Sequence, residues 1–267
     1  MAGNVDSVGA DSGARYMAFG DDSQYEGVLV FAFIIFKRTR LKSILREFEE
    51  VRKRFKFPEG VGIHCRELFS GQRRDKLGLS HLSREDITSI LTNLITIINR
   101  NEAGLRFAYA LEDKVKHMFD EPLMFESPDG GPNIQMPAKY DPKGVLGTLA
   151  QACFVVRPDG AHGPQAKDCQ IHIAPDTTPV KFLGERKRQA HFLTSGFNDV
   201  HPEPGRVYSV EPLIGDGGYP QLLQIADVLA YICAHAMHPE DDKRKYLSLY
   251  MNIKKRVRSV YGCDDQL

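Results

Sequence analysis

Residues 222–232 read Leu222-Leu223-Gln224-Ile225-Ala226-Asp227-Val228-Leu229-Ala230-Tyr231-Ile232 and predict a helix that is apolar on almost every side. Such helices are normally buried, and an aspartate is seldom buried unless another group pairs with it. No lysine or arginine lies between Arg206 and Lys243, so no ion pair at helical spacing neutralises Asp227. The candidates that remain are a distant basic residue, a retained proton or a metal ion. A metal ion would make this helix one wall of an active site.

The predicted helix places Asp227 on a narrow, partly polar strip. At about 100° per residue, Gln224 and Tyr231 share its face. The side chains predicted to turn away into the core are Leu222, Ile225, Leu229 and Ile232.

Composition narrows the class of protein. The 267 residues suffice for one large domain, and the 35 basic and 35 acidic residues cancel. Binding to nucleic acid must therefore come from local patches. Five scattered cysteines without a visible signal peptide indicate reduced thiols and a cytoplasmic location. The longest apolar run, residues 28–36, is too short to cross a membrane.

Hydrophobic spacing predicts the elements of a mixed sheet with helices on its faces, which is an α/β fold. The predicted strands are residues 15–20, 27–36, 105–111, 169–174 and 206–212, with residues 21–24 as the turn of a first hairpin. The predicted helices are residues 41–55, 83–98, 145–156, 181–193 and 222–232, and Ser83 with Asp86 forms a capping box for the second of these.

The predicted domain covers residues 15–236 and follows a disordered leader of residues 1–14. Residues 118–165 include a Pro-, Gly- and Asp-rich stretch and are expected to be an insertion. Residues 237–267 are expected to form a helical extension, with a basic helix over 242–260 that packs on the core, binds nucleic acid or mediates contact with a second copy or a protein partner.

Three further acidic residues lie where predicted elements would deliver them to a shared centre. Asp21 follows the first strand, Glu67 lies between aliphatic residues, and Asp176 follows a later strand. Two carboxylates about 4 Å apart repel by roughly 4 kcal/mol at an effective dielectric near 20, so a cluster of them calls for a cation. Hard oxygen ligands suit Mg²⁺ or Mn²⁺, which can stabilise both oxygens in phosphodiester cleavage.

Each of these residues also has a structural interpretation. Asp21 suits a turn, Asp176 suits an Asx-turn or a helix cap, and Glu67 suits a solvent-facing position beside Arg66. A zinc site at Cys169 and His172 is disfavoured, because strand alternation puts the two on opposite faces. The adjacent pair His64 and Cys65 is poorly placed to act as base and nucleophile.

The chain resembles the DUF3800 family in three blocks, which are Tyr16-Met17-Ala18-Phe19-Gly20-Asp21-Asp22-Ser23, Ile63-His64-Cys65-Arg66-Glu67-Leu68 and Leu223-Gln224-Ile225-Ala226-Asp227-Val228-Leu229-Ala230-Tyr231. In the first block Asp22 stands in place of the usual Glu, and Gln24 in place of the usual Gly. The resemblance implies a ribonuclease H-like fold with an acidic metal centre. It implies metal binding by Asp21, Glu67 and Asp227, with Asp176 as the fourth carboxylate and His64 as an accessory.

The first hypothesis is therefore a Mg²⁺- or Mn²⁺-dependent nuclease with a two-metal centre, acting on RNA or DNA. Lys181, Arg186 and Gln224 are its candidate substrate-binding residues, and the basic clusters at 52–56, 186–188 and 254–258 are either phosphate contacts or solvated surfaces. The second hypothesis is a nucleic-acid-binding or effector module of the same fold with weak or no catalysis, which the altered first block favours.

Overall fold

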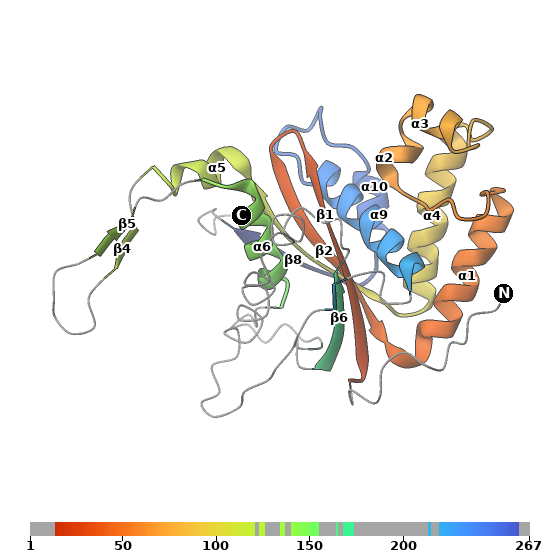
Figure 1. Ribbon diagram of the computed structural model, residues 1–267, viewed down its shortest axis with the longest axis horizontal. Helices are drawn as coiled ribbons and strands as arrows, with labels where there is room; N and C mark the ends of the chain where they lie inside the picture. The colour runs from red at the N-terminus through yellow and green to blue at the C-terminus, as the bar shows by residue number, and fades with distance from the viewer. Residues whose placement is uncertain are drawn as a thin grey trace.

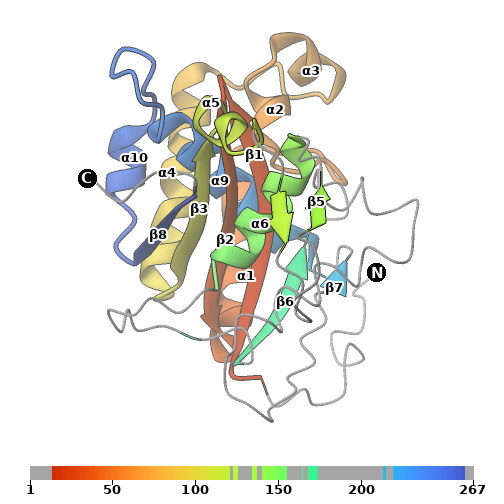
Figure 2. The same cartoon turned by 90° about the vertical axis from the view of Figure 1, so that its left-hand side faces the viewer.

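The computed structural model describes residues 14–120, 123–125, 134–136, 140–154, 164, 168–173, 213–214 and 219–261. These residues form an α/β fold around a mixed sheet in the order β7-β6-β1-β2-β3-β8 (Figures 1 and 2). Its strands are β1 (Tyr16–Tyr25), β2 (Val28–Lys37), β3 (Gly104–Leu111), β6 (Cys169–Ile173), β8 (Arg256–Tyr261) and the two-residue β7 (Leu213–Ile214). The first three run antiparallel, whereas β6 runs parallel to β1, β7 to β6 and β8 to β3.

The first hairpin turns five residues later than the sequence predicts. Residues 21–24 belong to β1, and the turn is Glu26-Gly27, with Tyr25 paired to Val28. Both turn residues have positive φ, 42° and 82°, which is the backbone that a two-residue hairpin requires. Asp21 is therefore a strand residue with a fixed direction, and its interpretation as a turn residue is wrong.

Helices cover both faces of the sheet (Figure 1). One face carries α9 (Pro220–Ala236) directly on β1 and β2, together with α1 (Leu41–Arg54), α4 (Arg84–Arg100) and α10 (Leu247–Met251). The other carries α6 (Pro142–Ala152) on β2 and β3, with α5 (Glu112–His117) beside β3. The short helices α2 (Cys65–Leu68) and α3 (Gly71–Lys76) follow α1, and the 3-10 turn η1 (Arg38–Arg40) precedes it.

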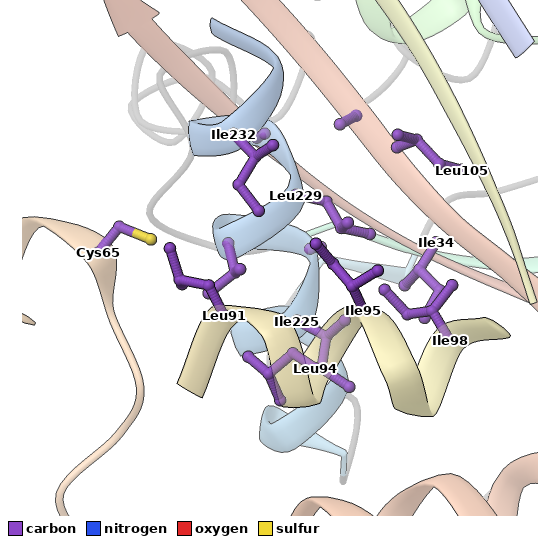
Figure 3. Close-up of a cluster of buried hydrophobic side chains, with 14 of the residues drawn as sticks. Ile34, Cys65, Leu91, Leu94, Ile95, Ile98, Leu105, Ile225, Leu229 and Ile232 are labelled. Carbon is purple, nitrogen blue, oxygen red and sulfur yellow. The ribbon is translucent and has the colours of Figure 1, made fainter. Parts of the chain in front are cut away.

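Alternation along β2 divides the core in two. Val30, Ala32 and Ile34 face the α9 side, whereas Phe31 and Phe33 face α6. Covered on both faces, β2 reads as one continuous apolar run. Between α9 and α4, the side chains of Ile225, Leu229 and Ile232 meet those of Leu91, Leu94 and Ile95 (Figure 3).

The two long helices of the first half are confirmed. The Ser83–Asp86 capping box of α4 is present in both directions. In α1 the apolar residues Ile44, Phe48 and Val51 are buried, and Glu47 is buried as well. Its carboxylate accepts hydrogen bonds from Ser43 and Asn101 and pairs with Arg100 at 3.1 Å. A buried charge is tolerated there because it is fully paired.

The prediction of a C-terminal helix over residues 242–260 is wrong. Residues 247–251 form the short α10, and Arg256–Tyr261 is the edge strand β8. Val257, Val260 and Tyr261 are of residue types enriched in strands, and β8 pairs along the edge of β3. The long helix on which a homodimer or protein partner was expected is therefore absent from residues 242–261.

Several predictions fall outside the described residues, namely most of the leader, the helix at 181–193 and the strand at 206–212. Within the span expected as an insertion, β4 (Leu123–Phe125) pairs with β5 (Ile134–Met136), and α6 packs against the main sheet. In the part of the chain that the structure describes, no helix is long and apolar enough to cross a bilayer.

Candidate active site

One strip of α9 is accessible, as the helical geometry predicts. Gln224, Asp227 and Tyr231 are partly exposed, and every other residue from 222 to 236 is buried. The apolar residues of α9 pack on the sheet and on α4, so the helix is fixed in place by the core. Its polar strip is thereby held rigidly at the surface.

Asp227 has a partner that the sequence did not reveal. Its Oδ2 accepts a hydrogen bond of 2.9 Å from the backbone N–H of Cys65, at the start of α2. One turn earlier, Gln224 Oε1 accepts a 2.7 Å bond from the N–H of Ile63. The segment 63–65 is thus clamped to α9 by two side chains, and Asp227 needs neither a distant cation nor a proton to be tolerated.

The same clamp brings His64 to the strip. Its Nδ1 lies 4.0 Å from Asp227 Oδ2, and 45% of its side chain is exposed. Gly62 makes room for this arrangement, because a Cβ at that position would lie 2.9 Å from His64 Nε2 and 3.2 Å from Gln224 Cδ. A histidine held beside a carboxylate and open to solvent is suited to proton transfer.

Asp21 approaches from the sheet. Alternation along β1 puts it on the face of Met17 and Phe19, which pack under α9, and puts Asp22 on the opposite face. Its Oδ1 accepts the N–H of Asp22 at 2.8 Å. Burial raises the pKa of the Cys65 thiol well above its usual range, and the charges of Asp227 and Asp21 raise it further. The charges of a carboxylate on β1 and a carboxylate on α9 thus act on the same buried thiol.

The raised pKa of Cys65 also decides against a thiol nucleophile. A reactive cysteine needs a lowered pKa and solvent access, whereas Cys65 is 1% exposed and faces two negative charges. Cys65 is therefore a packing residue whose backbone N–H, and not its sulfur, contributes to the site.

Of the other predicted ligands, only Glu67 lies within the described residues. Glu67 lies on α2, two residues beyond Cys65, and is partly exposed. Within the described ranges, no group of three or more His, Cys, Asp or Glu residues is arranged to hold a metal ion. Asp176, Lys181 and Arg186 lie outside those ranges, although β6 ends at Ile173 opposite Gly20, next to Asp21.

The sequence suggested His172 only as a zinc ligand, whereas the structure places it in the core. It is 1% exposed and stacks on Phe19 with ring centroids 4.4 Å apart. Cys169 packs in the core of the opposite face, as alternation predicts. Neither ring nitrogen of His172 has a hydrogen-bond partner among the described residues, and burial lowers its pKa to about 4.

The basic clusters have different roles. In the first, Arg52 donates hydrogen bonds to the carbonyls of Val61 and Pro58, so it anchors the loop that leads to the clamp. In the last, Lys254, Lys255 and Arg256 line a pocket of about 480 Å³ beside Tyr16, at the start of β1. Asp21 lies five residues along that strand, so this pocket is roughly 16 Å away from the carboxylates. The cluster at 186–188 lies outside the described residues.

No protein-family model matches the chain, and no curated protein or solved structure matches it. The resemblance to the DUF3800 family therefore stays a prediction.

Proposed function

We propose that the chain is a divalent-metal-dependent nuclease that hydrolyses phosphodiester bonds of RNA or DNA. The observation that carries this proposal is that Asp21 lies on the face of β1 that α9 covers, while Asp227 of α9 binds the backbone N–H of Cys65, and both carboxylates act on the thiol of Cys65. Both carboxylates are partly exposed, so they can reach a ligand from solvent.

The donor set suits Mg²⁺ or Mn²⁺. Mg²⁺ in phosphoryl-transfer sites is commonly held by one or two carboxylates, with waters and substrate phosphate oxygens completing the octahedron. Asp21 and Asp227 would supply those carboxylates, with Glu67 and Asp176 as the proposed ligands of a second ion. A bound ion would lower the pKa of a water molecule and stabilise charge on the phosphate.

Side chains of the protein would supply proton transfer and contact with the substrate. His64, exposed and beside Asp227, would hold or release a proton at Nε2. Gln224 is fixed through Oε1 by the N–H of Ile63, which positions its amide nitrogen to donate to a phosphate oxygen. The clamp thus holds the candidate proton carrier, His64 at the start of α2, beside the candidate substrate contact, Gln224 of α9.

The proposal includes a ribonuclease H-like fold. The supporting feature is the order β3-β2-β1-β6-β7, in which an antiparallel meander continues into parallel strands on the β1 side. An acidic residue on β1 and another on a helix packed against that strand agree with the resemblance in the three sequence blocks.

A non-catalytic nucleic-acid-binding or effector module is the second candidate. The observation that favours it is the hydrogen bond between Asp227 and Cys65, which gives the carboxylate a structural role without any cation. The described residues also lack a preformed group of three metal ligands.

Metal binding and cleavage separate the two candidates. A metal at 100 times its Kd should stabilise the fold by roughly 2.7 kcal/mol, read as a thermal shift with Mn²⁺ or Mg²⁺. Asp227→Asn keeps an oxygen that can accept from Cys65 but removes the charge, so it should fold and lose both the shift and Mn²⁺-dependent cleavage of labelled RNA and DNA.

Asp113→Asn is the matched control, because Asp113 is exposed on α5 across the sheet. It should retain the shift and the cleavage. Cleavage that survives in Asp21→Asn and Asp227→Asn would overturn the proposed site, and the absence of any metal effect in the wild type would favour the binding module.

A further inference from the structure

A second pocket adjoins the exposed strip of α9. It has a volume of about 600 Å³, within the range of small-molecule sites, and we call it the aromatic–basic pocket. The residues that define it here are Phe69, Arg74, Arg84, Tyr231, Lys245 and Tyr246. They come from four parts of the chain, namely the end of α2, α3, the start of α4 and the C-terminal half of α9 with the segment after it.

Its aromatic side is a stack of rings. Phe69 and Tyr231 are parallel within 10° with centroids 5.1 Å apart, and the His235 ring lies 4.0 Å from Tyr231, tilted by 37°. Tyr246 closes the side of the stack, 5.7 Å from Phe69 and 5.8 Å from Tyr231. Phe69, Tyr231 and Tyr246 are all partly exposed, so part of each ring is accessible to a ligand.

Its other side is cationic. Arg84 and Lys245 are exposed, and Arg74 is held in place by a hydrogen bond from Nη1 to the carbonyl of Leu68. The buried Nε of Arg74 has no hydrogen-bond partner among the described residues. None of the described residues that line the pocket is acidic, so three positive charges face it without a compensating carboxylate in its wall.

The pocket and the candidate active site share a wall. Tyr231 is one helical turn beyond Asp227 on the same strip of α9. Burial is the main cause that raises the pKa of Tyr231, and the nearby groups Tyr246 and Cys65 raise it further. Cys65 therefore acts on Tyr231 through its thiol and binds Asp227 through its backbone N–H.

We infer that the aromatic–basic pocket binds a single-stranded nucleic acid, with a base packed against the accessible parts of the Phe69, Tyr231 and Tyr246 rings and the flanking phosphates on Arg84 and Lys245. The inference rests on the proposed function for its class of ligand and adds the strandedness of the substrate. The aromatic and basic residues of the pocket begin one helical turn from Asp227, at Tyr231. They would guide the strand towards the site of cleavage.

A single strand fits this surface better than a duplex does. Bases in a duplex are stacked on one another and present only their edges, whereas an unpaired base offers its face to an aromatic side chain. Such stacking is tolerant of sequence, and the cations contribute affinity that depends on salt. The pocket therefore predicts that the protein prefers single strands to duplexes and does not read the sequence through the edges of the bases.

The test is fluorescence anisotropy with labelled 12-nucleotide single strands of DNA and of RNA, and the corresponding duplexes, in EDTA. The wild type should bind single strands at least about tenfold more tightly than duplexes. Tyr231→Leu, which keeps apolar volume but removes the ring, should weaken single-strand binding by about tenfold with an unchanged salt slope. Arg84→Ala/Lys245→Ala should weaken it and reduce the slope of log K against log salt by about 1.4.

The matched control is Lys42→Ala/Lys114→Ala, which removes the same charge from exposed positions on α1 and α5. It should bind like the wild type, and thermal melting should show that all variants fold. Equal affinity for single strands and duplexes, or wild-type binding by both pocket variants, would overturn the inference.

Cleavage with Mn²⁺ distinguishes this inference from the proposed function. If pocket variants bind like the wild type while Asp227→Asn alone abolishes cleavage, the pocket inference fails and the nuclease stands. If pocket variants lose single-strand binding while the wild type cleaves nothing, the nuclease fails and the pocket stands.

Discussion

At the scale of single residues, Asp227 and His172 show opposite relations between sequence and structure. Asp227 stands out in the sequence because it interrupts an apolar helix, and it indeed lies on the exposed strip. Its partner could not be predicted, because a backbone N–H carries no residue-specific signal. His172 does not stand out from its neighbours in the sequence. In the structure it is buried, and its ring nitrogens have no hydrogen-bond partner among the described residues.

His172 makes stability depend on pH. Burial lowers its pKa from 6.5 to about 4, so between these values the unfolded chain binds a proton that the folded chain does not. The effect of His172 on the free energy of unfolding should be constant above pH 6.5, and the free energy of unfolding should fall as the pH drops from 6.5 to about 4. The loss should be about 3 kcal/mol at most. Urea unfolding at pH 8 and pH 4.5 measures it.

His172→Leu is the variant that isolates this effect. It removes the buried ring nitrogens, so its free energy of unfolding should decline less than that of the wild type between pH 8 and pH 4.5. Burial also lowers the pKa of His235, which remains in both proteins. Identical declines in the two proteins would contradict the assignment.

At the scale of elements, the sequence predicts helices better than turns and edges. The capping box of α4 and the stripe of α1 are local patterns, so they could be predicted. The turn at Glu26-Gly27 was missed because the more polar residues 21–24 carried a stronger turn signal. Their extended conformation depends on pairing with β2, which local composition does not reveal.

Gly20 fixes the strand just before Asp21. It lies opposite Phe33, and a Cβ added to it would come 2.3 Å from Phe33 Cε1. Gly20→Ala should therefore destabilise the protein by about 1–3 kcal/mol through overpacking, measured by urea unfolding. Phe33→Leu in the same chain should recover part of the Gly20→Ala cost, because the two side chains share one space.

Gly144→Ala is the matched control for Gly20→Ala. Gly144 lies in α6, and the nearest atom to an added Cβ is 3.9 Å away. Alanine should be neutral or stabilise the helix by up to about 1 kcal/mol. A cost at position 144 equal to that at position 20 would show that the effect is not steric.

At the scale of the whole molecule, the α/β class could be predicted, but the edges of the sheet could not. Alternating strands and helices indicate a mixed sheet with covered faces, which the structure confirms. The position of β8 beside β3 depends on a pairing between distant segments, which local propensity does not encode. The placement of Asp21 and Asp227 on the same side of the sheet likewise depends on packing between distant segments, and the resemblance of three blocks had suggested that the two would lie together.

The edge strand β8 protects the sheet. A chain ending at Lys255 should leave the backbone groups of β3 exposed and should melt at a lower temperature and aggregate with increasing concentration. A chain ending at Tyr261 keeps the strand and is the control. Light scattering with thermal melting checks both, and a chain ending at Lys255 that stays monomeric and equally stable would contradict this role.

The hydrogen bond between Cys65 and Asp227 spans 162 residues of chain. On the ribosome, at about 5–20 residues per second, that separation corresponds to roughly 8–30 s of synthesis. During that time the meander of β1, β2 and β3 has emerged without α9 to cover its apolar face. The nascent protein therefore exposes apolar surface for most of its synthesis, and the hydrogen bond between Asp227 and Cys65 cannot form until translation has almost finished.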